Sequence, residues 1–144
     1  MTTGETLLRD ELRQHNYSPV VFDFEKPVSR DLTETVSILA RLSRFIIADI
    51  TDPSCIPQEL YAVVPDCIVP VQPLLSSQPI FIDGNEVERR PYSMFKDLQR
   101  RYHWVLPTYR YQDTDQLLSS IKEHIIKPAE EKGKELERKK NDPV

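Results

Sequence analysis

The stretch FIIADI at residues 45–50 decides the fold class, because five of its six residues are apolar. A short apolar run without alternation predicts a strand that is buried on both faces, as in a parallel sheet covered by helices. The polar tetrapeptide TDPS at 51–54 follows directly and predicts a turn. We therefore expect 45–50 to form a central strand of a parallel sheet.

The segments on either side alternate between helical and strand patterns. Helices are expected over 2–15, 30–43, 56–64, 93–102 and from 113 onward, and strands over 19–24, 67–75 and 104–111. Pro128 is expected to kink or restart the last helix. This alternation predicts an α/β fold, a flavodoxin-like parallel sheet flanked by helices. Residues 1–128 are expected to form this domain, and 129–144 a charged helical tail.

Two further features concern single strands. Pro70 and Pro73 lack a backbone donor, so the strand at 67–75 is expected either to have a broken ladder or to lie at a sheet edge. The pair Asp83-Gly84 follows the apolar tripeptide IFI and predicts a small β-hairpin.

The chain of 144 residues holds only three glycines, Gly4, Gly84 and Gly133, which lie far apart. Neither GxGxxG nor GxxxxGK[ST] can be written from them, so both glycine-rich phosphate-binding loops are excluded. The net charge of −4 disfavours a nucleic-acid partner. No apolar run approaches about 20 residues, so no membrane span is expected.

The two cysteines, Cys55 and Cys67, are too few for a disulfide framework and lack metal-ligand spacing. They suit a reduced, cytoplasmic setting. The three histidines are scattered, and we expect no metal site. Cys55 is either a nucleophile or an inert thiol, and no histidine lies near it in sequence to activate it.

Ligands of open α/β sheets bind outside the carboxyl ends of the strands, which here selects the loops 25–30 and 51–54 and the segment after residue 75. Glu59 is expected in the first turns of the helix that follows the second of these loops. A carboxylate there is favoured as the anion and can stabilise an oxocarbenium-like ribose. The alternative interpretation is that Glu59 merely suits the helix dipole.

Asp49, at the end of the central strand, has two interpretations of its own. It binds a ribose hydroxyl, or it caps the turn at 51–54 through an Asx-type bond. The basic pairs at 89–90 and 100–101 mark either a phosphate-binding patch or solvated surface. Tyr109 and Tyr111 share one face of the last strand, and packing accounts for them.

The order of these segments, from the first helix to the last, resembles a bacterial Toll/interleukin-1 receptor (TIR) domain. The segment SRDLTETVSILARLSRFIIADITDPS resembles a helix and the central strand of that family. The segment SCIPQEL is similar to the family's Ser-x-x-Cys-x-x-Glu-Leu motif, with Cys55 one residue farther from the glutamate.

The resemblance places Glu59 on the glutamate that serves cleavage of NAD at its nicotinamide–ribose bond. It implies that the loop at 25–30 lines a nucleotide site and mediates assembly between domains, with Phe24 and Arg30 lining the site. Asp49, Thr51 and Ser54 would be neighbours of Glu59 in that site. NAD would be a substrate rather than a cofactor, in bacterial defence or signalling. The alternative is a non-catalytic module that acts by self-association or with a fused or partner domain.

The segment ADITDPSCIPQELYA also resembles nucleoside 2-deoxyribosyltransferases, in which the glutamate attacks the sugar carbon directly. Both resemblances therefore imply chemistry at an N-glycosidic bond and centre it on Glu59. A TIR domain begins with a strand before its first helix, whereas here a helix is expected within a few residues of Met1. The expected fold is thus a TIR-like domain without its first strand.

Overall fold

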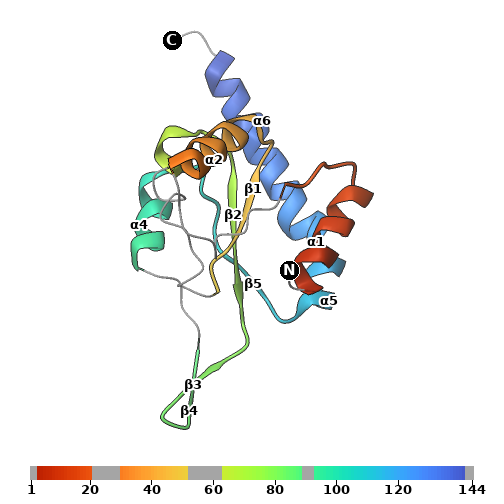
Figure 1. The fold of residues 1–144 in the computed structure, drawn as a ribbon, viewed down its shortest axis with the longest axis vertical. Coiled ribbons are helices and arrows are strands. Elements are labelled where there is room, and N and C mark those ends of the chain that lie inside the picture. The colour runs from red at the N-terminus through yellow and green to blue at the C-terminus, as the bar shows by residue number, and fades with distance from the viewer. Residues whose placement is uncertain (1–2, 21–29, 52–62, 89–92, 142–144) are drawn as a thin grey trace.

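The structure is a computed structural model, and it describes residues 3–20, 30–51, 63–88 and 93–141. Most of the predicted strand at 19–24 and most of the predicted helix at 56–64 lie outside these residues, although 63–66 are helical. The described chain forms a parallel sheet with helices on both faces and a separate hairpin (Figure 1). The predicted α/β class is therefore confirmed.

The sheet contains three strands, β1 (Ile46–Asp49), β2 (Val71–Ser76) and β5 (Tyr109–Tyr111), in the order β1-β2-β5. Both pairings are parallel, with Ile46 opposite Val71 and Leu74 opposite Tyr109. The carboxyl ends of all three strands therefore lie along one edge of the sheet. The apolar run at 45–50 forms β1, as its sequence predicts. Among the described strands, however, β1 lies at an edge of the sheet rather than at its centre, and none of its residues is fully buried.

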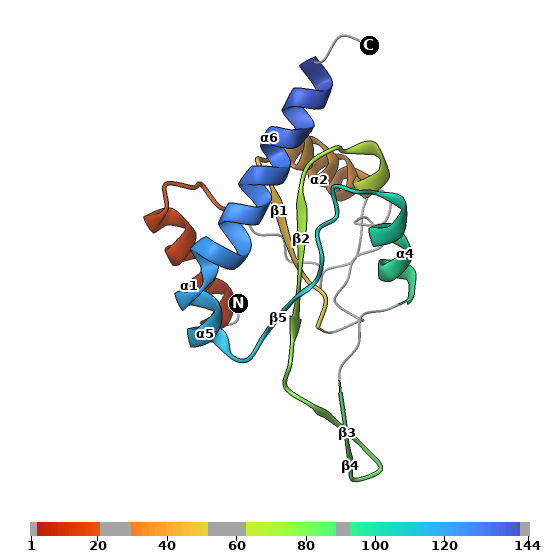
Figure 2. The same cartoon turned by 180° about the vertical axis from the view of Figure 1, so that it is seen from behind.

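One face of the sheet is covered by α1 (Thr3–Gln14), α5 (Thr114–Ser119) and α6 (Lys127–Asn141) (Figure 2). The buried residues of this layer are Leu12, Leu74, Leu117, Ile121, Ile125 and Ile126. The other face is covered by α2 (Arg30–Leu42) and α4 (Ser93–Arg101). Neighbouring residues of β1 alternate between these layers, Ile47 facing the first and Ile46 the second.

Pro70 and Pro73 do not place this strand at an edge of the sheet, because β2 lies between β1 and β5. The backbone N–H groups of Val71 and Ser77 donate to carbonyls of the 104–111 segment. The nitrogen of Pro73 lies on the same side of β2, but a proline nitrogen carries no hydrogen to donate. The ladder is thus broken on that side only. The buried side chain of Gln72 fills the break, since its Nε2 donates 2.9 Å hydrogen bonds to the carbonyls of Pro73 and Pro107.

The predicted strand at 104–111 is shorter than expected. It consists of an isolated parallel bridge from Val71 to Val105 and of β5. Between that bridge and the pair Leu74–Tyr109, β2 advances three residues and its partner four. This extra residue, beside Pro107, interrupts the pairing in the manner of a β-bulge.

The last helix changes its pitch before Pro128 rather than at it. A π-helical turn spans Lys122–Ile126, and α6 follows without a gap. The wider turn lets two consecutive residues, Ile125 and Ile126, both enter the core. Ala129 at the start of α6 is also buried. Whether the domain ends at 128 stays a prediction.

The predicted hairpin is confirmed as β3 (Ile80–Ile82) paired with β4 (Asn85–Val87). Asp83 and Gly84 both have positive φ, 52° and 78°, as a tight hairpin turn of the type I′ kind requires. The hairpin projects from the carboxyl edge of the sheet, at the bottom of Figure 1.

Candidate functional site

Asp49 is the last residue of β1, and its carboxylate joins two strands at the carboxyl edge of the sheet. Its Oδ1 accepts a 2.9 Å hydrogen bond from the backbone N–H of Thr51. Its Oδ2 accepts a 2.9 Å hydrogen bond from the hydroxyl of Tyr111, at the end of β5. The first bond is the Asx-type cap, one of the two interpretations that the sequence left open for Asp49. The second bond holds the carboxylate from β5, the strand at the other edge of the sheet.

Thr51 extends the pairing of β1 and β2 by one step with its side chain. Its Oγ1 accepts a 2.9 Å hydrogen bond from the backbone N–H of Ser76. In a continued parallel ladder, a backbone carbonyl of the neighbouring strand would accept this bond instead. Ser76 is buried, and its Oγ accepts from the backbone N–H of Gln78. A hydrogen bond therefore links the turn after β1 to the end of β2.

Hydrogen bonds also link the ends of β2 and β5. The backbone N–H and the hydroxyl of Ser77 both donate to the carbonyl of Tyr111, at 2.8 and 2.9 Å. The side chain of Gln78 donates to the carbonyl of Gln112 at 2.8 Å. Hydrogen bonds thus connect the carboxyl ends of all three strands, and Asp49 and Tyr111 lie within this network.

The Asp49 carboxylate is exposed, so a ligand can reach it. Each carboxylate oxygen has two lone pairs, and the network described above uses one on each. Asp49 can therefore accept further hydrogen bonds, for instance from the hydroxyls of a sugar, while Thr51 and Tyr111 hold it in place.

The structure brings together Asp49 and Thr51 from the predicted site. Phe24, Ser54 and Glu59 lie outside the described residues, and Arg30 is the first residue of α2, with its side chain outside them. The sequence interpretation of Tyr111 as a packing residue is incomplete: its ring contacts the core, but its hydroxyl reaches Asp49. The signal for this contact was the place of Tyr111 at the end of the last strand.

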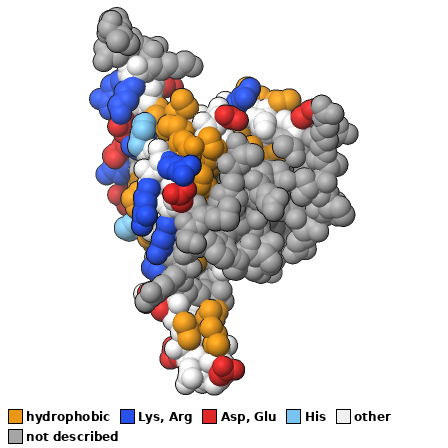
Figure 3. Space-filling model, turned by 90° about the vertical axis from the view of Figure 1, so that its left-hand side faces the viewer, with side chains coloured by type: hydrophobic (Ala, Val, Ile, Leu, Met, Phe, Trp, Pro, Cys, Tyr) orange, Lys and Arg blue, Asp and Glu red, His pale blue; other side chains and the backbone are white. Residues whose placement is uncertain are grey.

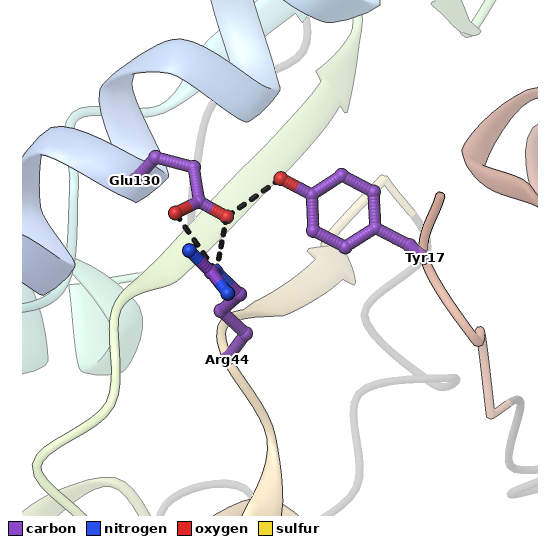
Figure 4. Close-up of polar contacts among 3 residues, drawn as sticks. All are labelled: Tyr17, Arg44 and Glu130. Atoms are coloured by element: carbon purple, nitrogen blue, oxygen red, sulfur yellow. Dashed lines mark hydrogen bonds and ion pairs between the residues drawn. The ribbon is translucent and has the colours of Figure 1, made fainter. Parts of the chain in front are cut away.

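A second polar cluster lies at the opposite edge of the sheet, before β1 begins (Figure 4). The carboxylate of Glu130 in α6 accepts a 2.6 Å hydrogen bond from the hydroxyl of Tyr17. It also forms an ion pair with Arg44, whose Nε lies 2.6 Å from Oε1 of Glu130. Burial and the bond to Glu130 raise the pKa of Tyr17 to about 12. Burial also acts to raise the pKa of Glu130, but hydrogen bonds from Tyr17 and Arg44 outweigh it and hold that pKa below its ordinary value.

This second cluster joins α6 to the loop after α1 and to the residues before β1, and its Glu130 side chain is only 20% exposed. Within the described ranges, no group of three or more His, Cys, Asp and Glu side chains can hold a metal ion. No helix of those ranges is long and apolar enough to cross a membrane.

Comparison with protein-family models, with curated proteins and with solved structures gave no match to this chain.

Proposed function

We propose that the chain is a TIR-like domain that cleaves the N-glycosidic bond of NAD or a related nucleotide, in bacterial defence or signalling. The observation that carries the proposal is the Asp49 carboxylate, exposed at the carboxyl edge of a parallel sheet and held by Thr51 and Tyr111. This edge is where parallel α/β sheets bind nucleotides. Glu59 follows Asp49 by ten residues and would supply the second carboxylate.

In the proposed reaction, Asp49 accepts a hydrogen bond from a ribose hydroxyl and orients the sugar. The bond between C1′ and the nicotinamide nitrogen breaks, and its electron pair leaves with nicotinamide, which becomes neutral. The Glu59 carboxylate stabilises the oxocarbenium-like ribose that remains. A water oxygen then bonds to C1′ and releases a proton, giving the hydrolysed nucleotide. Phe24, Arg30, Thr51 and Ser54 would line the same site.

The direct test is release of nicotinamide from NAD, measured by chromatography. We expect turnover by the unaltered chain and its loss in Glu59→Gln. Glu131→Gln, a change of the same type at an exposed position of α6, should retain full activity. Asp49→Asn should raise KM more than it lowers kcat, because it weakens a binding contact. A folded Glu59→Gln protein with unchanged turnover would contradict the proposal.

A second candidate function, a non-catalytic module that acts by self-association, is favoured by a different observation. Large apolar side chains are exposed at both ends of the molecule, among them Phe81 at 70% and Leu42 at 78%. Exposed apolar patches often mark surfaces that bind other proteins. The absence of nicotinamide release together with concentration-dependent assembly would favour this function over the first.

A further inference from the structure

Arg110, in the middle of β5, is the only Lys or Arg among the described residues that end the three strands or form the hairpin. These residues are 49–51, 74–88 and 109–113. The nucleotide of the proposed function carries phosphate groups, and arginine suits phosphate because its planar guanidinium donates two parallel hydrogen bonds. Since the sequence has no glycine-rich phosphate loop, a charged side chain is the simplest means of holding a phosphate at this edge.

The side chain of Arg110 lies on the face of the sheet that α2 and α4 cover. Its neighbours Tyr109 and Tyr111 pack in the layer of α1 and α5, and side chains alternate between the two faces along a strand. The register agrees, because Arg110 lies opposite Leu75, which packs in the core beneath α4. Arg110 and the Tyr111–Asp49 contact are therefore on opposite faces of one edge.

The face of Arg110 is also the one that the chain rejoins after Glu59. Val64 follows Glu59 by five residues and belongs to the same core as Phe95 of α4. The segment after α4 returns to the sheet where β2 begins, so α4 itself begins toward the carboxyl edge (Figure 2). Its positive dipole end and the exposed Lys96 of its first turn add positive charge on this face.

Five carboxylates lie in the same ranges, and their places decide whether a phosphate can approach. Asp49 lies opposite Leu74 and so faces the α1 and α5 layer, where Asp113 caps α5. Asp83 and Glu86 lie on the hairpin, which projects from the sheet. Figure 3 shows the acidic side chains of this hairpin at the bottom of the view. The fifth carboxylate, Glu88, is the one that meets Arg110.

The ion pair of Arg110 with Glu88 is loose. Nη1 of Arg110 lies 3.7 Å from Oε1 of Glu88, beyond hydrogen-bond distance, and the two side chains are 37% and 68% exposed. An exposed pair at this distance contributes little, whereas a phosphate can bind the guanidinium through two parallel hydrogen bonds. A phosphate can therefore displace the Glu88 carboxylate.

We propose that Arg110 binds the phosphate next to the ribose of the nucleotide, and that Glu88 occupies Arg110 when no nucleotide is bound. The strands of Asp49 and Arg110 are separated by β2, so the two backbones are about 10 Å apart. The nucleotide would lie over the carboxyl edge, with its ribose at Asp49 and its phosphate at Arg110. This inference rests on the proposed function, and it adds that the substrate is a phosphorylated nucleotide rather than a nucleoside.

The first test measures binding and needs no turnover. Its probe is ADP-ribose, which remains when nicotinamide leaves NAD, and calorimetric titration gives the Kd. Arg110→Gln should raise this Kd about 10-fold or more, the effect of losing a charged hydrogen-bond donor. Arg110→Lys keeps the charge without the paired donors and should restore binding in part. Glu88→Gln removes the competing carboxylate and should lower the Kd by up to about 5-fold. Arg101→Gln makes the same charge change at the other end of α4 and should leave the Kd unchanged.

The second test compares substrates with and without phosphate. Nicotinamide riboside contains the glycosidic bond of NAD but no phosphate. Arg110→Gln should raise KM for NAD about 10-fold more than it raises KM for nicotinamide riboside. For NAD, it should also raise KM more than it lowers kcat, because Arg110 binds a group that does not react.

Several outcomes would overturn the phosphate site. One is an equal Kd for ADP-ribose in Arg110→Gln and in the unaltered chain, and another is no binding of ADP-ribose at all. Weaker binding in Arg89→Gln/Arg90→Gln or in Lys96→Gln, but not in Arg110→Gln, would assign the phosphate to other cations. Inorganic pyrophosphate bound as tightly as ADP-ribose would make Arg110 a general anion site, which equally contradicts the proposal.

These outcomes are separate from the fate of the proposed reaction. Binding of ADP-ribose that depends on Arg110, in a chain that releases no nicotinamide from NAD, would support the phosphate site and count against the reaction. Release of nicotinamide that depends on Glu59 but not on Arg110 would have the opposite meaning.

Discussion

The hydroxyl of Tyr17 donates a 2.6 Å hydrogen bond to Oε1 of Glu130, although 113 residues separate the two in sequence. The ring of Tyr17 packs edge-on against Phe45, with centroids 5.2 Å apart, so the hydroxyl is held where α6 passes the amino end of β1. Arg44, from the residues before β1, completes the contact. One carboxylate thus joins three segments that are distant in sequence (Figure 4).

The first prediction concerns the titration of Tyr17. Burial raises its pKa to about 12, and the hydrogen bond to Glu130 and the negative charge of that residue add to the rise. Glu130→Gln removes the charge, so the Tyr17 pKa should fall toward the ordinary value of about 10. Ultraviolet titration of tyrosinate measures this, with Glu131→Gln on the same helix as the matched control. An unchanged Tyr17 pKa in Glu130→Gln would show that burial alone raises it.

The second prediction concerns stability in acid. The pKa of folded Glu130 lies below its ordinary value, because the bonds from Tyr17 and Arg44 outweigh the effect of burial. A carboxyl of this kind adds stability above the pKa of the unfolded chain, about 4.3, and that stability is lost as the pH falls through the folded pKa. The free energy of unfolding should therefore decline less steeply below about pH 4.3 in Glu130→Gln than in the unaltered chain. Urea unfolding at a series of pH values measures the slope, and equal slopes would contradict the prediction.

The third prediction concerns the hydrogen bond between Asp49 and Tyr111. A double-mutant cycle with Asp49→Asn and Tyr111→Phe should give a coupling free energy of about 0.5–1.5 kcal/mol, the usual net value of one hydrogen bond. Urea unfolding of the four proteins supplies the cycle. Additive effects would mean that the hydroxyl and the carboxylate act independently. In the assay for nicotinamide release, Tyr111→Phe should raise KM less than Asp49→Asn, since it frees the carboxylate without removing its charge.

Part of this architecture is predictable from sequence because it depends on neighbouring residues. The apolar run at 45–50 forms β1, and the pair Asp83-Gly84 forms the hairpin turn, since both signals are local. The cap from Asp49 to the N–H of Thr51 also spans only two residues. Each of these predictions needs no knowledge of how distant segments meet.

The remainder depends on register, which sequence spacing does not reveal. Tyr111 reaches Asp49 because β2 lies between their strands and aligns both, a relation that spans 62 residues. The sequence predicts one continuous strand over 104–111, because the extra residue beside Pro107 leaves the apolar pattern nearly intact. The π-helical turn at Lys122–Ile126 is hidden for a similar reason, since the change of period lasts only one turn.

The fourth prediction concerns Gln72, whose side chain fills the break in the ladder of β2. Gln72→Leu would leave the carbonyls of Pro73 and Pro107 without these two bonds in a buried setting, and should cost about 1–3 kcal/mol of unfolding free energy. Gln112→Leu, the same substitution at an exposed position, is the control and should change stability by no more than about 0.5 kcal/mol. Equal stability of Gln72→Leu and the unaltered chain would mean that the break needs no polar side chain.

The last prediction contrasts two glycines that differ in backbone conformation. Gly133 lies inside α6, and a Cβ there would meet the nearest atom, Cγ of Pro70, at 3.9 Å, an ordinary van der Waals distance. Gly133→Ala should therefore raise the unfolding free energy by about 0.5–1 kcal/mol, because alanine loses less backbone entropy in a helix. Gly84 has open space around it but a φ of 78°, which an alanine adopts only with strain, so Gly84→Ala should give no such gain. Urea unfolding of both variants tests the contrast, and a loss of stability in Gly133→Ala would mean that α6 and Pro70 are packed too tightly to admit a methyl group.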